Sequence, residues 1–168
     1  FEDIILYLEN VLLVYGPLGV FLASIIEEII APIPSTLVIL GTSFIILKGA
    51  VISPETVFSL FINVVLPASL GVTLGSVLVY GLAYYLGKEL IDRWGKYLGV
   101  SWEYIEKVQD KFQEGRSDKI ILFTFRALPV IPSIAINVFS GFIRYDLKKF
   151  IIITFLGMLV RAFILGFL

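Results

Sequence analysis

The sequence contains no histidine and no cysteine, and only 16% of its residues are charged. The missing histidine excludes Ser-His hydrolases, His-dependent lipid phosphatases, HExxH zinc proteases and His-ligated haem, and the missing cysteine excludes thiolate chemistry. A two-aspartate intramembrane protease is also disfavoured, because every aspartate lies outside the long apolar runs: Asp3, Asp92, Asp110, Asp118 and Asp146. We therefore expect no enzyme, no metal and no cofactor. The net charge of −1 offers no basic surface for nucleic acid.

Apolar residues are abundant instead. Hydrophobic residues make up 58% of the chain, and the mean hydropathy is +0.97, well above an ordinary soluble domain. A helical crossing needs about 20 residues, so the 168 residues predict one all-α, polytopic membrane domain over 1–168 with membrane lipids as its surroundings. We expect it in the cell membrane as a multi-pass protein.

The apolar stretch 10–47 is interrupted by only four residues, two acids and two prolines: Glu27, Glu28, Pro32 and Pro34. If the prolines lay in water, the arm 35–47 would form only about 20 Å of helix against a hydrocarbon core of about 30 Å. A re-entrant hairpin over about 17–47 fits better, with the acids near its tip in protein or a wet cavity.

A second interruption of this kind follows in the segment FRALPVIPSIAINVFSGF. Arg126 precedes Pro129 and Pro132, and neither apolar arm around these prolines is long enough to span. The sequence therefore predicts a second re-entrant hairpin over about 120–143. One tip carries acid and the other carries base.

Two ordinary crossings are expected as well. The uncharged stretch 56–87 would overshoot the bilayer as one helix of about 48 Å, so we expect Pro67 to divide it and leave a transmembrane helix at about 68–87. Gly71 and Gly75 form a GxxxG face for close helix contact. The last transmembrane helix, about 150–168, carries Arg161.

Charged residues dominate 88–119, with apolar residues at helical spacing: Trp102, Ile105, Val108 and Phe112. This pattern predicts an interfacial amphipathic segment, with Ser101 as N-cap and Gly115 just beyond the helix end. Basic residues concentrate here and in 144–149, which places both segments in the cytoplasm. The second hairpin then enters from the cytoplasm and the first from outside, an inverted repeat like that of many transporters.

Several of these segments together resemble the DedA superfamily, also called the VTT or SNARE-associated membrane protein domain. They are Glu27 ahead of PIPS, LGSVLVYGLAYYLGKELIDRWGKYLG with the charged helix after it, and RALPVIP followed by Asn137 and Gly141. The resemblance implies two opposed re-entrant hairpins and lipid movement across the bilayer. In bacteria the implied cargo is undecaprenyl phosphate, moved with proton-motive coupling; eukaryotic relatives are phospholipid scramblases.

By the same resemblance, Glu27 matches the acid of the first hairpin and Arg126 the arginine of the second. The chain departs from the bacterial pattern at Thr36, where another acid is common, and at Pro132, where a second arginine is common. Pro132 with Asn137 is closer to the branch near the eukaryotic scramblases. Arg161 stands where relatives commonly have tryptophan, and an ion-pair role is open for it.

For each candidate residue a functional and a structural role remain open. Glu27 could be a titratable gate or proton carrier, or an ion-pair partner of Arg126 or Arg161; Glu28 could share either role. Arg126 could bind a phosphate or form a salt bridge. Asn137 could bind ligand or join two helices by a hydrogen bond. The hairpin-tip prolines Pro32, Pro34, Pro129 and Pro132 would break helices and leave unpaired backbone groups.

We predict a small lipid translocase, flippase-like or scramblase-like, that moves a polyprenyl phosphate or a phospholipid between the two tips. Its transport or lipid-binding residues would be Glu27, Glu28, Arg126, Asn137 and Arg161. Two alternatives stay open: a proton-coupled transporter of small ions or cationic solutes, and a structural membrane protein whose charges only lock the fold.

Overall fold

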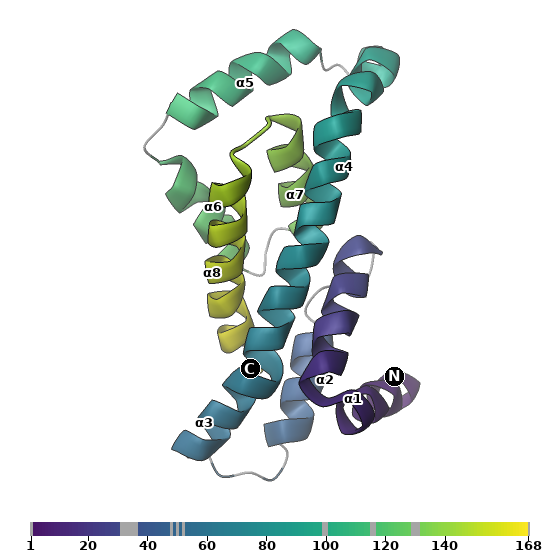
Figure 1. Ribbon diagram of the computed structural model, residues 1–168, viewed down its shortest axis with the longest axis vertical. Helices are drawn as coiled ribbons and strands as arrows, with labels where there is room; N and C mark the ends of the chain where they lie inside the picture. Colours follow the sequence, from purple (N-terminus) through teal and green to yellow (C-terminus); the bar gives the residue numbers. More distant parts are fainter. Residues whose placement is uncertain are drawn as a thin grey trace.

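The computed structural model describes residues 2–30, 37–47, 49, 51, 53–98, 101–114, 117–128 and 132–167. Over these residues it is helical and contains no strand, which confirms the all-α prediction. The elements are α1 (Glu2–Ile29), α2 (Leu37–Leu47), α3 (Pro54–Leu60), η1 (Phe61–Val65), α4 (Leu66–Leu98), α5 (Trp102–Glu114), α6 (Asp118–Ala127), α7 (Ser133–Phe142) and α8 (Leu147–Gly166). Figure 1 shows α4 as the long central helix, and α1, α7 and α8 pack against it.

Pro67 does not divide the helix that contains it. Residues 54–93 form a continuous apolar helical stretch. By length and composition, this stretch and Leu147–Gly166 could each cross a membrane. The turn before Pro67 is π-helical, and at its end the Leu66 N–H reaches back to the Phe61 carbonyl. A wider turn accommodates a ring that lacks an N–H, so the helix continues where a break was predicted.

The helix α1 changes direction at Gly16. Gly16 has φ 53° and ψ −136°, a conformation open to glycine but strained for other residues. Pro17 follows in the first turn of the second part, where a missing N–H costs no hydrogen bond. A separate helical arm therefore runs from Pro17 to Ile29.

This arm and α2 pack side by side and run in opposite directions (Figure 1). Helices α6 and α7 also run in opposite directions, with α6 against α8 and α7 against α4. With 10 or 11 residues, α2, α6 and α7 are each only about 15 to 17 Å long, about half of a hydrocarbon core. Pro32, Pro34, Thr36 and Pro129 lie outside the described residues, and the re-entrant course of both helix pairs stays a prediction.

Small residues let the helices approach closely. A methyl group added at Gly71 would collide with the Phe21 carbonyl, and one at Gly75 would lie 2.8 Å from the Glu28 Cβ. This confirms the predicted close contact along the GxxxG face of α4, whose partner is the second part of α1.

Many large apolar side chains of α4 and α8 are exposed, and many polar side chains are buried, the reverse of a soluble protein. Large exposed side chains follow the outer face of α4 at Leu70, Leu74, Leu78, Leu82 and Leu86. Serine, threonine, asparagine, glutamate and arginine side chains are buried between the helices. This distribution fits a lipid surrounding, where apolar groups need no burial and polar groups need protein partners.

The predicted amphipathic segment 88–119 is divided among three helices. Helix α4 extends to Leu98, α5 follows directly after Ser101, and α6 begins at Asp118. Helix α5 is amphipathic, with half-buried Trp102, Ile105 and Phe112 and an exposed charged face. Gly115 and the Val108 side chain lie outside the described residues. The membrane-surface position of α5 stays a prediction.

Tyr145, between α7 and α8, contacts residues of α4, α5 and α6. Its hydroxyl donates to the buried Asp118 carboxylate at 2.7 Å, and its carbonyl accepts from the Tyr80 hydroxyl at 2.5 Å. Phe112 of α5 packs edge-on against the Tyr145 ring. The Arg144 guanidinium lies over Tyr84 and Trp102, 5.3 and 5.5 Å from the ring centroids, and so links α4 to α5.

We expect Tyr145→Phe to lower the free energy of unfolding by about 1–3 kcal/mol at neutral pH, because buried Asp118 loses its donor. Burial, and then the hydrogen bond to Asp118, raise the pKa of Tyr145 in the folded protein. This stabilisation is therefore complete below about pH 10, where unfolded tyrosine titrates, and is lost as the pH rises further. Unfolding measured against pH should show a steeper alkaline decline for wild type than for Tyr145→Phe. Tyr85→Phe, at an 81% exposed position, is the control. Parallel curves of unfolding free energy against pH for wild type and Tyr145→Phe would contradict a stabilising hydrogen bond between Tyr145 and Asp118.

Candidate functional site

Four helices bring the five charged and amide residues of one buried polar cluster together. The last turn of α1 supplies Glu27 and Glu28, and the last turn of α6 supplies Arg126. Asn137 comes from α7 and Arg161 from α8, and all five side chains are at most 5% exposed. Residues more than 100 positions apart in the chain thus meet inside the protein.

Glu28 is the centre of the hydrogen-bond network. Its Oε1 atom accepts from Asn137 Nδ2 at 2.6 Å and from Ser76 Oγ at 3.1 Å. The same oxygen lies 3.9 Å from Arg126 Nη1, which makes a buried ion pair. One carboxylate oxygen therefore faces donors from α4, α6 and α7.

Arg126 is completely buried and is held from two sides. Its Nη2 atom donates to Asn137 Oδ1, and its guanidinium carbon lies 5.3 Å from the centroid of the Phe150 ring. The bond to Oδ1 turns the Asn137 amide so that its N–H groups face Glu28. Nε and Nη1 of Arg126 make no hydrogen bond within the part of the chain that the structure describes.

Arg161 is the second buried cation of the cluster. Its Nη1 atom is 3.5 Å from Ser133 Oγ, at the first residue of α7. The charges of both Glu28 and Glu27 act on its guanidinium. The cluster thus contains two acids and two bases, and this balance offsets part of the cost of burying charge.

Two glycines allow the charged residues to approach. Gly75 of α4 faces the Glu28 side chain, and Gly157 of α8 lies where a methyl group would collide with Arg126 Cβ. A larger residue at Gly75 would push α1 away from α4, and one at Gly157 would push α6 away from α8, so either would displace one member of the ion pair.

The structure gathers all five candidate transport residues, Glu27, Glu28, Arg126, Asn137 and Arg161, in one place. It puts Glu28 in direct contact with Asn137 and Arg126. Glu28 faces α4 because Phe21, Ser24 and Glu28 share the face of α1 that meets the GxxxG glycines. Pro132 is the exposed N-cap residue of α7.

Sequence reasoning missed the hydroxyl partners Ser76 and Ser133. Nothing in the sequence distinguishes them from the other serines of the apolar stretches. Their role depends on which residues α4 and α7 place beside the charges.

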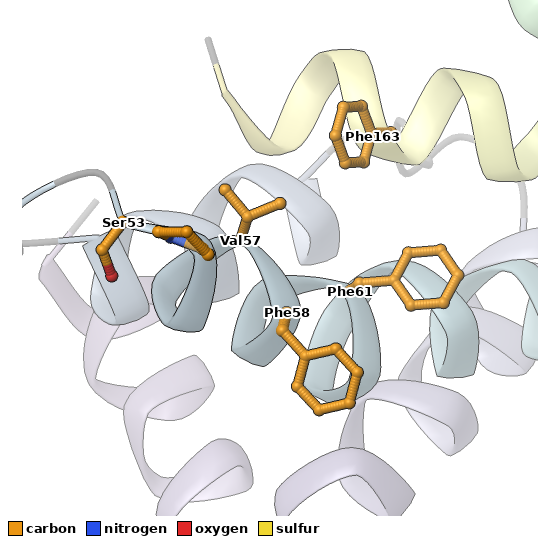
Figure 2. Close-up of a pocket in the computed structure, with 6 residues that line it drawn as sticks. Ser53, Val57, Phe58, Phe61 and Phe163 are labelled. Atoms are coloured by element: carbon orange, nitrogen blue, oxygen red, sulfur yellow. The ribbon is translucent and has the colours of Figure 1, made fainter.

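A separate cavity of about 580 Å³ lies between α3, η1 and α8. Figure 2 shows Phe163 of α8 across this space from Val57 and Phe61. The other lining residues are Ser53, Pro54 and Phe58, so its walls are almost entirely apolar. It shares no residue with the charged cluster.

No group of three His, Cys, Asp or Glu side chains that could hold a metal ion occurs within the described residues. The side chains of the cluster themselves offer several kinds of binding chemistry. Guanidinium, amide and hydroxyl groups bind an oxyanion, and carboxylates bind a proton or a cation.

Comparison with known proteins identifies relatives. A family model described as the VTT domain matches residues 33–168. Undecaprenyl phosphate transporter A of Bacillus subtilis is 25% identical over 94% of this chain and 70% of its own length. The uncharacterized membrane protein YkoX of the same species is 29% identical over 89% of this chain and 61% of its own length. An alkaline phosphatase-like protein of Lactococcus lactis is 28% identical over 98% and 72%, respectively. No solved structure matches the chain.

Proposed function

Because the chain belongs to the VTT-domain family, we propose that it is a lipid translocase that moves a phosphate-bearing lipid across the membrane. The observation that carries the proposal is the buried cluster in which Arg126 and Asn137 hold donors toward one oxygen of Glu28. A buried charge is costly in a membrane protein, and ionisable groups in such positions are functional by default.

The chemistry of the donors favours a phosphate. Arg126 presents a planar fork of N–H groups that matches two oxygens of a phosphate at once. Asn137 adds amide donors and Ser76 a hydroxyl, so each oxygen of a head group could receive a hydrogen bond. The apolar outer faces of α4 and α8 leave the lipid tails in the bilayer.

The layout of the short helices supports passage of a head group at this place. The arm 17–29 and α6 approach from opposite ends of the long axis (Figure 1), and their last turns meet at the ion pair. We propose that each belongs to a re-entrant hairpin and that the two hairpins form an inverted repeat. Irregular backbone at membrane depth is tolerated where protein or a wet cavity surrounds it.

We propose a polyprenyl phosphate as the cargo, by analogy with the relative named as an undecaprenyl phosphate transporter. Glu27 is the candidate for proton coupling. It is 5% exposed and its charge acts on Arg161, so protonation of Glu27 would change the balance of the cluster and bias access toward one side.

Lipid translocation in proteoliposomes tests the proposal. We expect wild type to move a fluorescent polyprenyl phosphate and to be slower with a phospholipid, because only a terminal phosphate offers several unshared oxygens to Arg126. A pH gradient should change the rate in wild type and leave Glu27→Gln unaffected. Movement of both lipids at equal rates would indicate a scramblase. Movement of neither, in folded protein with a pH gradient, would refute lipid transport and favour a transporter of small solutes.

A further inference from the structure

We infer that the Glu28 carboxylate occupies the place of the lipid phosphate, as an internal anion that the head group must displace. This inference rests on the proposed function, since it names the residue that competes with the cargo for the same donors. It assigns a specific role to Glu28, because this carboxylate accepts hydrogen bonds from Asn137 and Ser76.

The donors around Glu28 form a site for an oxyanion. Asn137 Nδ2, Ser76 Oγ and Arg126 Nη1 approach the single atom Oε1 at 2.6, 3.1 and 3.9 Å. They come from three helices, and each parent residue is completely buried. N–H and O–H groups donate to a phosphate oxygen as they do to a carboxylate oxygen. A phosphate oxygen could therefore take the position of Oε1.

Two N–H donor atoms of Arg126 form no hydrogen bond with Glu28. Arg126 Nη1 is too far from Oε1 for a hydrogen bond, and neither Nη1 nor Nε finds another acceptor within the described residues. A carboxylate has two oxygens, whereas a terminal phosphate has three and carries more charge. The phosphate would therefore satisfy buried N–H groups that Glu28 does not reach.

Two anions cannot occupy this place together, since like charges in a buried site repel strongly. Within the described residues, the charges that act on Glu28 are those of Arg126 from α6 and Arg161 from α8, and Glu27 is its neighbour in the chain. The hydrogen-bond donors from α4 and α7 are the uncharged Ser76 and Asn137. Binding of phosphate at Arg126 must therefore be coupled to withdrawal or protonation of Glu28. Where Glu28 responds by protonation, this coupling links head-group binding to proton uptake.

Glu28→Gln tests the competition, because glutamine keeps the shape of the side chain and removes its charge. The probe is farnesyl phosphate, and the readout is its dissociation constant for the purified full chain in detergent. We expect Glu28→Gln to bind about tenfold more tightly than wild type, a size typical of coupling between two ligands. Glu89→Gln, the same change at an exposed position of α4, should bind like wild type.

The outcomes separate this inference from the proposed function. Unchanged or weaker binding to Glu28→Gln, while wild type binds and Arg126→Ala does not, would overturn the inference and leave the proposed function standing. No binding of farnesyl phosphate to folded wild type would overturn both.

A second measurement needs only wild type and so remains informative if Glu28→Gln does not fold. Farnesyl sulfate carries a charge that does not titrate near neutral pH, so any pH dependence of its binding belongs to the protein. We expect its affinity for wild type to rise severalfold as the pH is lowered, because protonation of Glu28 frees Arg126 and Asn137. An affinity independent of pH would contradict the displacement of a charged Glu28.

Discussion

Arg126→Ala is expected to abolish lipid movement and to lower the free energy of unfolding by about 3–5 kcal/mol, the cost of leaving one member of a buried ion pair without its partner. Glu28 would lose its cationic neighbour and Asn137 the donor that orients its amide. The readouts are initial transport rate in proteoliposomes and reversible unfolding in detergent. Arg93→Ala, at an exposed position of α4, should change neither.

A double variant separates the structural from the functional role of Arg126. Arg126→Met with Glu28→Gln removes both charges and fills a similar volume, so we expect it to recover much of the lost stability. Transport should remain absent, because no guanidinium is left to bind phosphate. Recovery of transport together with stability would show that the two residues only stabilise the fold and that Arg126 does not bind the lipid phosphate.

Gly71→Ala is expected to lower the free energy of unfolding by about 1–3 kcal/mol, the usual cost of overpacking. The new methyl group would collide with the Phe21 carbonyl, a backbone atom that cannot move aside without shifting α1 away from α4. Because Glu28 lies on the same face of α1, its contacts with Ser76 and Asn137 would lengthen, and transport should fall as well.

Gly81→Ala is the matched control on the same helix. A methyl group at Gly81 has no atom within 4 Å, so the substitution should stabilise α4 by up to about 1 kcal/mol through the higher helix propensity of alanine. Comparison of the two variants by unfolding isolates the effect of close packing. An equal gain in stability for both would show that α1 and α4 are not in tight contact at Gly71.

Much of the architecture could be predicted because the bilayer constrains the chain so strongly. Length and hydropathy indicated an all-helical membrane domain, and the prolines with charged residues marked the interrupted stretches. The glycine spacing predicted the close contact at Gly71 and Gly75. These features depend on local chemistry: a proline lacks an N–H, and a glycine lacks a side chain, wherever they occur.

Other features could not be read from the chain. Pro67 was expected to divide a helix. A π-helical turn before Pro67 accommodates the proline instead, and α3, η1 and α4 form one continuous helix. Whether a proline breaks or only widens a helix depends on the packing around it, here the buried Val64 and Val65 in the core with α8 residues Met158 and Ala162.

The sequence by itself determined that buried charges exist in this protein and on which segments they lie, because the bilayer penalises every such residue independently of its neighbours. The tertiary structure decided which of them meet. It paired Glu28 with Arg126 through Asn137 and Ser76 and placed Glu27 on another side of the same helix turn. The physical reason is that adjacent helical residues point about 100° apart, so only the packing of α1 against α4 and α7 selects the acid that reaches the arginine.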